Sequence, residues 1–215
     1  MQATEAGRRR LVRFHHCRQD IYCFEVPPQC PFCGQGVGAR RLEEAALSID
    51  SPFVDGHREK CSFLLKPTQG TFLRDYDGHS DLHVGISSTH GTVYSYTALG
   101  VQRDGEGWEQ SVSVPLLPPH AWALLNQWDK YLEDFCAAAT WLPHRYEENL
   151  HNCYTFALAF INAVLRADGS GPLDKHEFTE RFVLPRTRTA SKYITLHRAV
   201  EAHGFHATAM QPAES

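Results

Sequence analysis

The sequence predicts an α+β protein in which an antiparallel sheet is followed by packed helices. Three observations lead to this prediction. Apolar residues alternate with polar or small ones along short runs between residues 82 and 114, which is the period of half-buried strands. Turn-forming residues separate these runs by short loops. Beyond Pro118 and Pro119 the apolar residues take the spacing of amphipathic helices.

Three strands are expected in the sheet. The first covers 82–86, and its alternation places His83 opposite the apolar face. A Thr-His-Gly turn leads to a second strand at 92–97, which is rich in Tyr and Thr. A third strand runs over 108–114 and is stopped by Pro115. Short loops between consecutive strands predict an antiparallel meander.

The C-terminal half is expected to contain several helices. Apolar residues at helical spacing predict an amphipathic helix over 124–135. A second apolar helix is expected to begin after Asn152, because asparagine is favoured at helix N-caps. Two shorter helices are expected at 174–182 and 191–203, separated by Pro185.

Changes of composition along the chain predict its organisation. The segment after the first ten residues carries Cys, His and turn formers, and the next segment contains an acidic, alanine-rich piece. Regular patterning begins near residue 71, and the last residues are small and polar. The expected parts are a flexible arm (1–10), a zinc-knuckle-like β segment (11–40), a connector (41–70), the main domain (71–206) and a disordered tail (207–215).

Composition limits the class of protein. With 42% apolar residues in a chain of 215, the sequence is typical of a globular protein. A net charge of −4 gives no general attraction to nucleic acid, so the expected partner is another protein. No apolar run is long enough to cross a membrane, and no secretory signal precedes the first strand. An intracellular site, cytoplasmic or nuclear, is therefore expected. No glycine loop for phosphates is present, so we expect no organic cofactor.

Cys153 is the candidate nucleophile. It follows Asn152 at a predicted helix start, where the helix dipole favours a thiolate. His83 on the first predicted strand is the candidate base, and Asn152 or a nearby backbone amide could stabilise an oxyanion. The alternative is that Cys153 is a small buried residue of an apolar helix. Spacing alone leaves both readings open.

The N-terminal segment contains a candidate zinc site. Cys30 and Cys33 are separated by two residues and followed by glycine, which is the form of a zinc knuckle. A structural site needs four ligands, and Cys17 with either His16 or Cys23 would complete it. His16 and Cys17 are adjacent, so binding of one ion by both requires a bend in the chain. A metal-free β-hairpin is the alternative. The odd number of seven cysteines also favours thiols over a disulfide framework.

The order of these features resembles that of the circularly permuted papain-like folds. A strand histidine, His83, is followed by a tyrosine-bearing strand at 93–96, a long helix, and Asn152-Cys153 at a helix start. The PPPDE thiol peptidases and the lecithin-retinol acyltransferase-like enzymes share this order. The resemblance implies that His83 is the base and Cys153 the nucleophile. The acyltransferase-like group carries a second histidine where this chain has Ser95 or a neighbouring tyrosine, which favours the two-residue dyad.

A second resemblance covers nearly the whole chain. Five segments are similar to the family of makorin-2 opposite-strand proteins: 61–65, 78–86, 105–109, 127–135 and 141–147. The family name records the position of a gene and implies no chemistry.

Two functions follow as hypotheses. The first is a cysteine hydrolase that cleaves a thioester, isopeptide or peptide bond in a protein or acylated protein, with Cys153 and His83 as its dyad. The second is a catalytically inactive papain-like scaffold that serves as a protein-interaction module. The first requires the side chains of Cys153 and His83 to meet, and the second does not.

Overall fold

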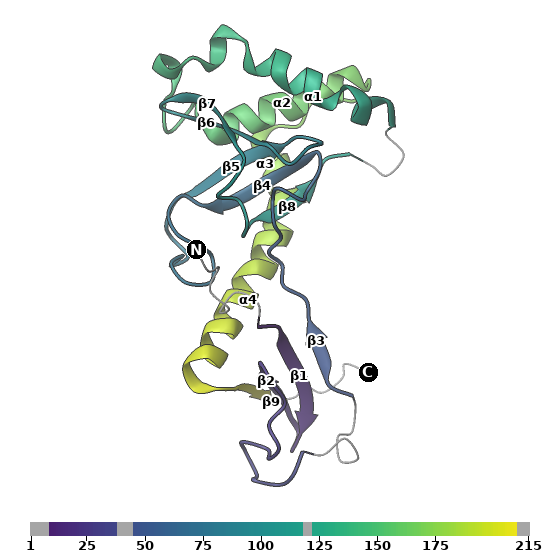
Figure 1. Cartoon of the computed structure of the whole chain (residues 1–215), viewed down its shortest axis with the longest axis vertical. Coiled ribbons are helices and arrows are strands. Elements are labelled where there is room, and N and C mark those ends of the chain that lie inside the picture. The colour runs from purple at the N-terminus through teal and green to yellow at the C-terminus, as the bar shows by residue number, and fades with distance from the viewer. Residues whose placement is uncertain (1–8, 38–44, 118–121, 210–215) are drawn as a thin grey trace. The chain divides into compact units, whose positions relative to one another are not determined.

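The structure, a computed structural model, describes residues 9–37, 45–117 and 122–209. The α+β class predicted from the sequence is confirmed: antiparallel sheets and several helices make up the fold (Figure 1). The chain divides into two compact units. The first unit combines Met1–Ser51 with Ser191–Ser215, and the second is Pro52–Ala190. The C-terminal helix therefore contributes to both units.

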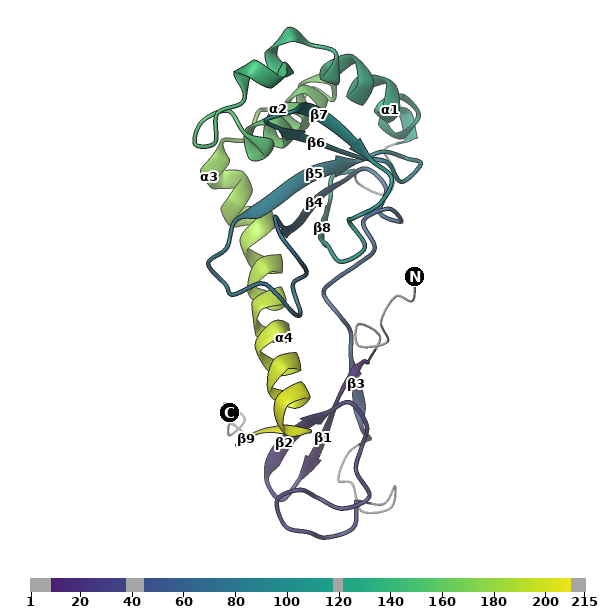
Figure 2. The same ribbon diagram turned by 60° about the vertical axis from the view of Figure 1, so that its left-hand side comes forward.

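The first unit contains a four-stranded antiparallel sheet in the order β3-β1-β2-β9 (Figure 2). Its strands are β1 (Leu11–His16), β2 (Gln19–Cys23), β3 (Leu47–Ile49) and β9 (His206–Ala209). Phe14, Ile21 and Cys30 belong to its buried core. Because β9 pairs with β2, residues 207–209 form part of a strand, contrary to the disordered tail expected from residue 207. Residues 210–215 lie outside the described part.

The second unit contains a five-stranded antiparallel sheet in the order β7-β6-β5-β4-β8. Its strands are β4 (Ser62–Pro67), β5 (Leu82–Ser87), β6 (Val93–Thr97), β7 (Gly100–Asp104) and β8 (Val112–Pro115). Two details differ from the predicted meander. The three consecutive strands of the meander are β5, β6 and β7. The predicted third strand at 108–114 corresponds to β8, which pairs with β4 and not with the meander. The expected connector 41–70 also contains β4, whose continuous apolar run is buried between its neighbours.

Two helices cover one face of this sheet (Figure 1). They are α1 (Trp122–Cys136) and α2 (Cys153–Ala167), and the two short 3-10 turns η2 (Ala139–Trp141) and η3 (Pro143–Arg145) lie between them in the chain. Phe156 on α2 packs against Tyr96, Phe135 and Trp141. This aromatic cluster fixes the start of α2 against the sheet. The two helices predicted at 124–135 and after Asn152 are thereby confirmed.

A continuous helical run follows, made of α3 (Lys175–Phe178), the π-helical turn η4 (Thr179–Val183) and α4 (Leu184–His203). The prediction that Pro185 separates two helices is therefore wrong. A proline ring normally clashes with the carbonyl four residues earlier. The wider π-helical turn directly before Pro185 relieves this clash and lets the helix continue. No helix in 9–37, 45–117 or 122–209 has the length and apolar character needed to cross a membrane.

Candidate metal centre and the Cys153–His83 pair

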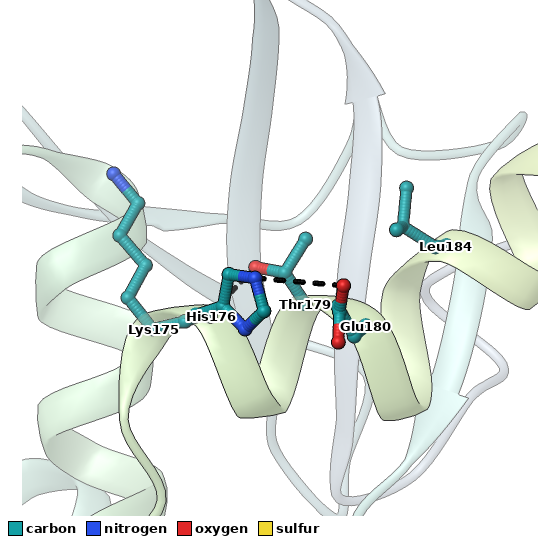
Figure 3. Close-up of a pocket in the computed structure, with 5 residues that line it drawn as sticks. All are labelled: Lys175, His176, Thr179, Glu180 and Leu184. Atoms are coloured by element: carbon teal, nitrogen blue, oxygen red, sulfur yellow. Dashed lines mark hydrogen bonds and ion pairs between the residues drawn. The ribbon is translucent and has the colours of Figure 1, made fainter.

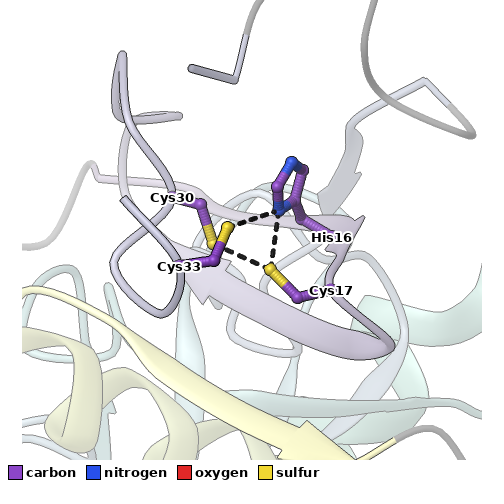
Figure 4. Close-up of side chains that lie close together, drawn as sticks. All are labelled: His16, Cys17, Cys30 and Cys33. Carbon is purple, nitrogen blue, oxygen red and sulfur yellow. Dashed lines mark hydrogen bonds between the residues drawn. The ribbon is translucent and has the colours of Figure 1, made fainter. Parts of the chain in front are cut away.

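Three thiols and one imidazole of the first unit converge on one point. The ligand atoms of His16, Cys17, Cys30 and Cys33 all lie within 4.8 Å of one another (Figure 4). His16 Nδ1 is 2.8 Å from the Sγ of Cys17 and 3.5 Å from the Sγ of Cys33, and the Sγ atoms of Cys17 and Cys30 are 3.4 Å apart. They are the three cysteines of the expected site together with His16, one of the two residues expected as the fourth ligand. Cys23, the alternative fourth ligand, belongs instead to the buried core of the unit.

The β1–β2 turn explains how adjacent residues can face one ion. His16 pairs with Gln19, so the turn has only two central residues, Cys17 and Arg18. Both have positive φ angles, 51° and 59°, as in a type I′ turn. This conformation costs roughly 1–2 kcal/mol per residue when the residue is not glycine. The turn supplies the bend that the sequence required, and it directs His16 and Cys17 to the same point.

The knuckle at 30–34 is organised by backbone hydrogen bonds. The amide of Gly34 donates to the carbonyl of Cys30, and the amide of Cys30 donates to the carbonyl of Gln35. The amide of Phe32 donates to the Sγ of Cys30 at 3.4 Å. Gly34 adopts a φ of 70°, which glycine tolerates without strain. Amides facing the sulfurs stabilise negative charge on the thiolates that bind a metal.

The thiols of this group influence each other's protonation. A hydrogen bond with Cys17 and one with the backbone of Gln35 lower the pKa of Cys33. The pKa of Cys17 is raised to about 12, first by its hydrogen bond with Cys33. In the metal-free group Cys17 therefore keeps its proton and donates it in a hydrogen bond to the sulfur of Cys33. A bound cation would remove this competition, because coordinated thiols are deprotonated.

Cys153 lies at the first position of α2, as predicted, and Asn152 is its N-cap. The Asn152 Oδ1 accepts hydrogen bonds from the amides of Tyr154 and Thr155 at 3.0 and 3.2 Å. Its amide nitrogen donates to the carbonyl of Glu148 at 2.5 Å. Both ends of the Asn152 side chain are therefore occupied within the helix cap, which leaves it poorly placed to bind an oxyanion.

The pKa of Cys153 is raised, contrary to the expectation from the helix dipole. Burial is the largest cause, and it outweighs hydrogen bonds from the backbone of Val84 and of the first helical turn. Desolvation disfavours the thiolate, while amides at a helix start favour it. Here desolvation wins, so Cys153 is a thiol at neutral pH.

His83 lies among different neighbours. Its ring packs against that of Trp108 with centroids 5.7 Å apart, and it pairs across the sheet with Lys66. The Lys66 ammonium lies 4.6 Å from the Trp108 ring centroid and donates to the Gly107 carbonyl. Burial, and then the charge of Lys66, lower the pKa of His83 to about 4. Such an imidazole is a weak base, since an effective general base has a pKa near the working pH.

The two members of the expected dyad lie on opposite faces of the sheet. Tyr154, next to Cys153, packs against Phe63, which pairs with Ile86 of β5. Alternate residues of a strand point to opposite faces, so Ile86 faces α2 and His83 points away from it. Within the described part of the chain no hydrogen bond links His83 with Cys153. The structure therefore does not bring the pair together.

A shallow cavity of about 410 Å³ lies along the helical run after residue 174 (Figure 3). It is lined by Lys175, His176, Thr179, Glu180 and Leu184. Its surface is mainly apolar; His176 lies 3.5 Å from Glu180, and the Thr179 hydroxyl donates to the Lys175 carbonyl at 2.7 Å. No cysteine and no set of three metal ligands lies among its lining residues, so we assign it no chemistry.

Some features of these sites were not visible in the sequence. Trp108 and Lys66 enclose His83, although both lie far from it in the chain. Their approach follows from the pairing of β4 with β5 and from the loop that precedes β8, neither of which has a local signature. The backbone amides around Cys30 and Cys33 were expected from the knuckle motif.

Comparisons with known proteins match two family models to the chain. A family model described as DUF4796 N-terminal matches residues 9–37, and one described as DUF4796 C-terminal matches residues 46–200. The chain is 62% identical over 208 residues to a human protein named MKRN2 opposite strand protein, with 97% of this chain and 93% of the relative covered. No solved structure matches. The N-terminal match contains all four residues of the candidate metal centre. The papain-like topology stays a prediction.

Proposed function

We infer the function from the geometry of the residues, because the chain belongs to the DUF4796 family, whose descriptions name regions and no chemistry. We propose a non-catalytic protein-interaction module whose first unit is stabilised by a zinc ion. Cys17, Cys30, Cys33 and His16 would hold this ion. The observation that carries the proposal is the convergence of these four side chains on a strained two-residue turn.

The donor set supports zinc as the metal. Three thiols and one imidazole form one of the common structural zinc sites, and soft thiolates disfavour calcium and magnesium. In a tetrahedral site with Zn–S near 2.3 Å and Zn–N near 2.0 Å, neighbouring ligand atoms lie roughly 3.5–3.8 Å apart. The Cys17–Cys30 and His16–Cys33 separations of 3.4 and 3.5 Å are close to this spacing. The His16 Nδ1 and Cys17 Sγ atoms, at 2.8 Å, would need to move apart.

A structural role for the ion follows from the small core of the first unit. The buried cluster that includes Phe14, Ile21 and Cys30 has few members, and the strands around it are short. Small units of this kind commonly rely on a metal for stability. The four side chains fill the coordination sites of one tetrahedral ion, which is typical of structural zinc.

The absence of an assembled dyad supports a non-catalytic module over a hydrolase. Cys153 has a raised pKa, His83 has a lowered one, and they face opposite sides of the sheet. A cysteine hydrolase needs a thiolate and a base within hydrogen-bond reach. We therefore favour the interaction module.

Phe32 supplies a candidate contact for a partner. It lies between Cys30 and Cys33, it is 57% exposed, and its ring makes a T-shaped contact with that of Phe205 at a centroid distance of 6.2 Å. Zinc on both flanking cysteines would fix its backbone. A rigid exposed aromatic residue is typical of the anchors that dominate protein interfaces. The partner would present an apolar pocket to this ring.

Selective labelling of Cys153 tests the non-catalytic assignment. We expect Cys153 in the native chain to react slowly with iodoacetamide at pH 7, with the rate rising at higher pH because its pKa is raised. We expect His83→Ala to leave this rate unchanged within about twofold, since a working base would contribute about a hundredfold or more. Mass spectrometry of the Cys153 peptide measures the rate. Labelling that depends strongly on His83 would favour the hydrolase.

Substitution of Phe32 tests the interaction role. A protein partner identified by crosslinking in cells is expected to bind Phe32→Ala at least about tenfold more weakly than the unmodified chain, as for an interface anchor. The matched control is Leu150→Ala, which removes an 80% exposed apolar side chain from the second unit. Calorimetry with the purified partner gives both affinities. Equal binding by both variants would exclude the knuckle as the contact.

A further inference from the structure

Among residues 9–37, 45–117 and 122–209, a buried histidine on α4 finds no hydrogen-bond partner. His197 belongs to the first unit and is only 3% exposed. Its Nδ1 and Nε2 are both enclosed, and neither forms a hydrogen bond with any residue in the part of the chain that the structure describes. Leaving a buried polar group unpaired costs about 1–3 kcal/mol. Such an exception requires an explanation, because most buried polar atoms in proteins are paired.

The surroundings of His197 are aromatic. Its ring meets Phe24 edge-on, with centroids 4.9 Å apart, and is tilted against Tyr193 with centroids 6.0 Å apart. Phe24 follows directly after β2, whereas His197 and Tyr193 lie on α4. The contact between His197 and Phe24 therefore joins α4 to the β1–β2 hairpin, whose turn carries Cys17. A neutral imidazole fits this environment as a flat, weakly polar ring.

The charged groups around this contact do not together stabilise a positively charged His197 ring. Glu201 on α4 favours the protonated form, whereas Arg198 opposes it. Arg9 lies over the Phe24 ring, 5.9 Å from its centroid, and the charge of Arg10 acts on Tyr193. Of these groups, Glu201 and Arg198 act on the His197 ring itself, with opposite signs. Burial, as the largest cause, lowers the pKa of His197 below its ordinary value of 6.5.

We propose that His197 makes the packing of α4 on the β1–β2 hairpin sensitive to acid. In its neutral form it holds α4 against Phe24, and protonation releases α4 from the hairpin. The sign follows from proton linkage. A histidine that is harder to protonate when folded than when unfolded binds fewer protons in the native state. The first unit then loses stability as the pH falls below about 6.5.

Hydrogen exchange tests this proposal on the full chain loaded with zinc. Between pH 7.5 and 5.5, protection factors of the α4 amides at 191–203 are expected to fall by up to about tenfold, the limit for one histidine measured one unit below its unfolded pKa. His197→Phe keeps a flat ring and is expected to remove this dependence. His203→Gln, which changes an exposed histidine on the same helix, is expected to retain it. Equal losses in the unmodified chain and in His197→Phe would overturn the proposal, including losses caused by release of zinc.

A second measurement needs no variant. In an NMR titration of the unmodified chain, the His197 ring is expected to stay neutral at pH values somewhat below 6.5, where a histidine of an unfolded chain is already protonated. When it does titrate, the α4 amides are expected to lose protection in the same pH range. A His197 ring that titrates near pH 6.5 while α4 stays protected would overturn the proposal.

Discussion

Replacement of Cys30 by serine is expected to abolish zinc binding and to unfold the first unit while the second stays folded. Cys30 is a buried member of the metal group and of the core beneath it. Structural zinc in small fingers contributes about 10–16 kcal/mol of binding free energy that is also folding free energy. Without the zinc ion, the small core of this unit would lose the main contribution to its folding free energy. Hydrogen exchange of the β1 and β2 amides measures the result, and we expect protection to be lost.

The control for this substitution is Cys23→Ala. Cys23 lies in the same core, and its thiol approaches the Val12 carbonyl at 3.9 Å, but it is not part of the metal group. We expect this variant to keep zinc and to lose only about 1 kcal/mol, because a small buried side chain is truncated. Equal loss of protection in Cys23→Ala and Cys30→Ser would show that packing, and not a metal, determines the stability of the unit.

Replacement of Phe156 by alanine is expected to produce the second large effect, in the other unit. The Phe156 side chain is fully buried and contacts Tyr96, Phe135 and Trp141. Truncating a buried phenylalanine typically costs 3–5 kcal/mol, because apolar contacts are lost and a cavity remains. We expect a loss of this size in the free energy of unfolding, measured by urea denaturation with tryptophan fluorescence.

Trp122→Ala is the matched control for Phe156→Ala. Trp122 begins α1 and its side chain is 66% exposed, so its removal is expected to change stability by only about 0.5 kcal/mol. A comparable loss in both variants would mean that the aromatic cluster does not hold α2 against the sheet. The position of Cys153 inferred from that packing would then also fail.

Local patterns in the sequence were sufficient to predict part of the fold. Asn152 was predicted as an N-cap, and α2 begins after it because one side chain satisfies two free amides. The alternation of β5 placed His83 on the face opposite Ile86, but that face is covered as well, so the strand is not half-buried as expected. What the pattern could not tell was which face α2 would cover. That choice depends on contacts such as Phe63 with Tyr154, which join residues far apart in the chain.

The metal group was predictable to a similar extent. Cys30 and Cys33 form a recognisable motif, because knuckle geometry depends on residues close in sequence. The turn at Cys17 and Arg18 was not predictable, since neither residue type favours positive φ angles. The choice of His16 over Cys23 as the fourth ligand depends on that turn, which brings His16 and Cys17 to one point. Pro185 misled the prediction for the converse reason: a strong local signal for a helix break is accommodated by a π-helical turn.

Metal content is the measurement that tests the zinc centre most directly. The full chain, purified without added metal or chelator, is analysed by inductively coupled plasma mass spectrometry together with Cys30→Ser and Cys23→Ala. We predict about one zinc ion per chain in the unmodified protein and in Cys23→Ala, and none in Cys30→Ser. A metal-free unmodified protein whose β1 and β2 amides remain protected, and which takes up no zinc when it is supplied, would contradict the account.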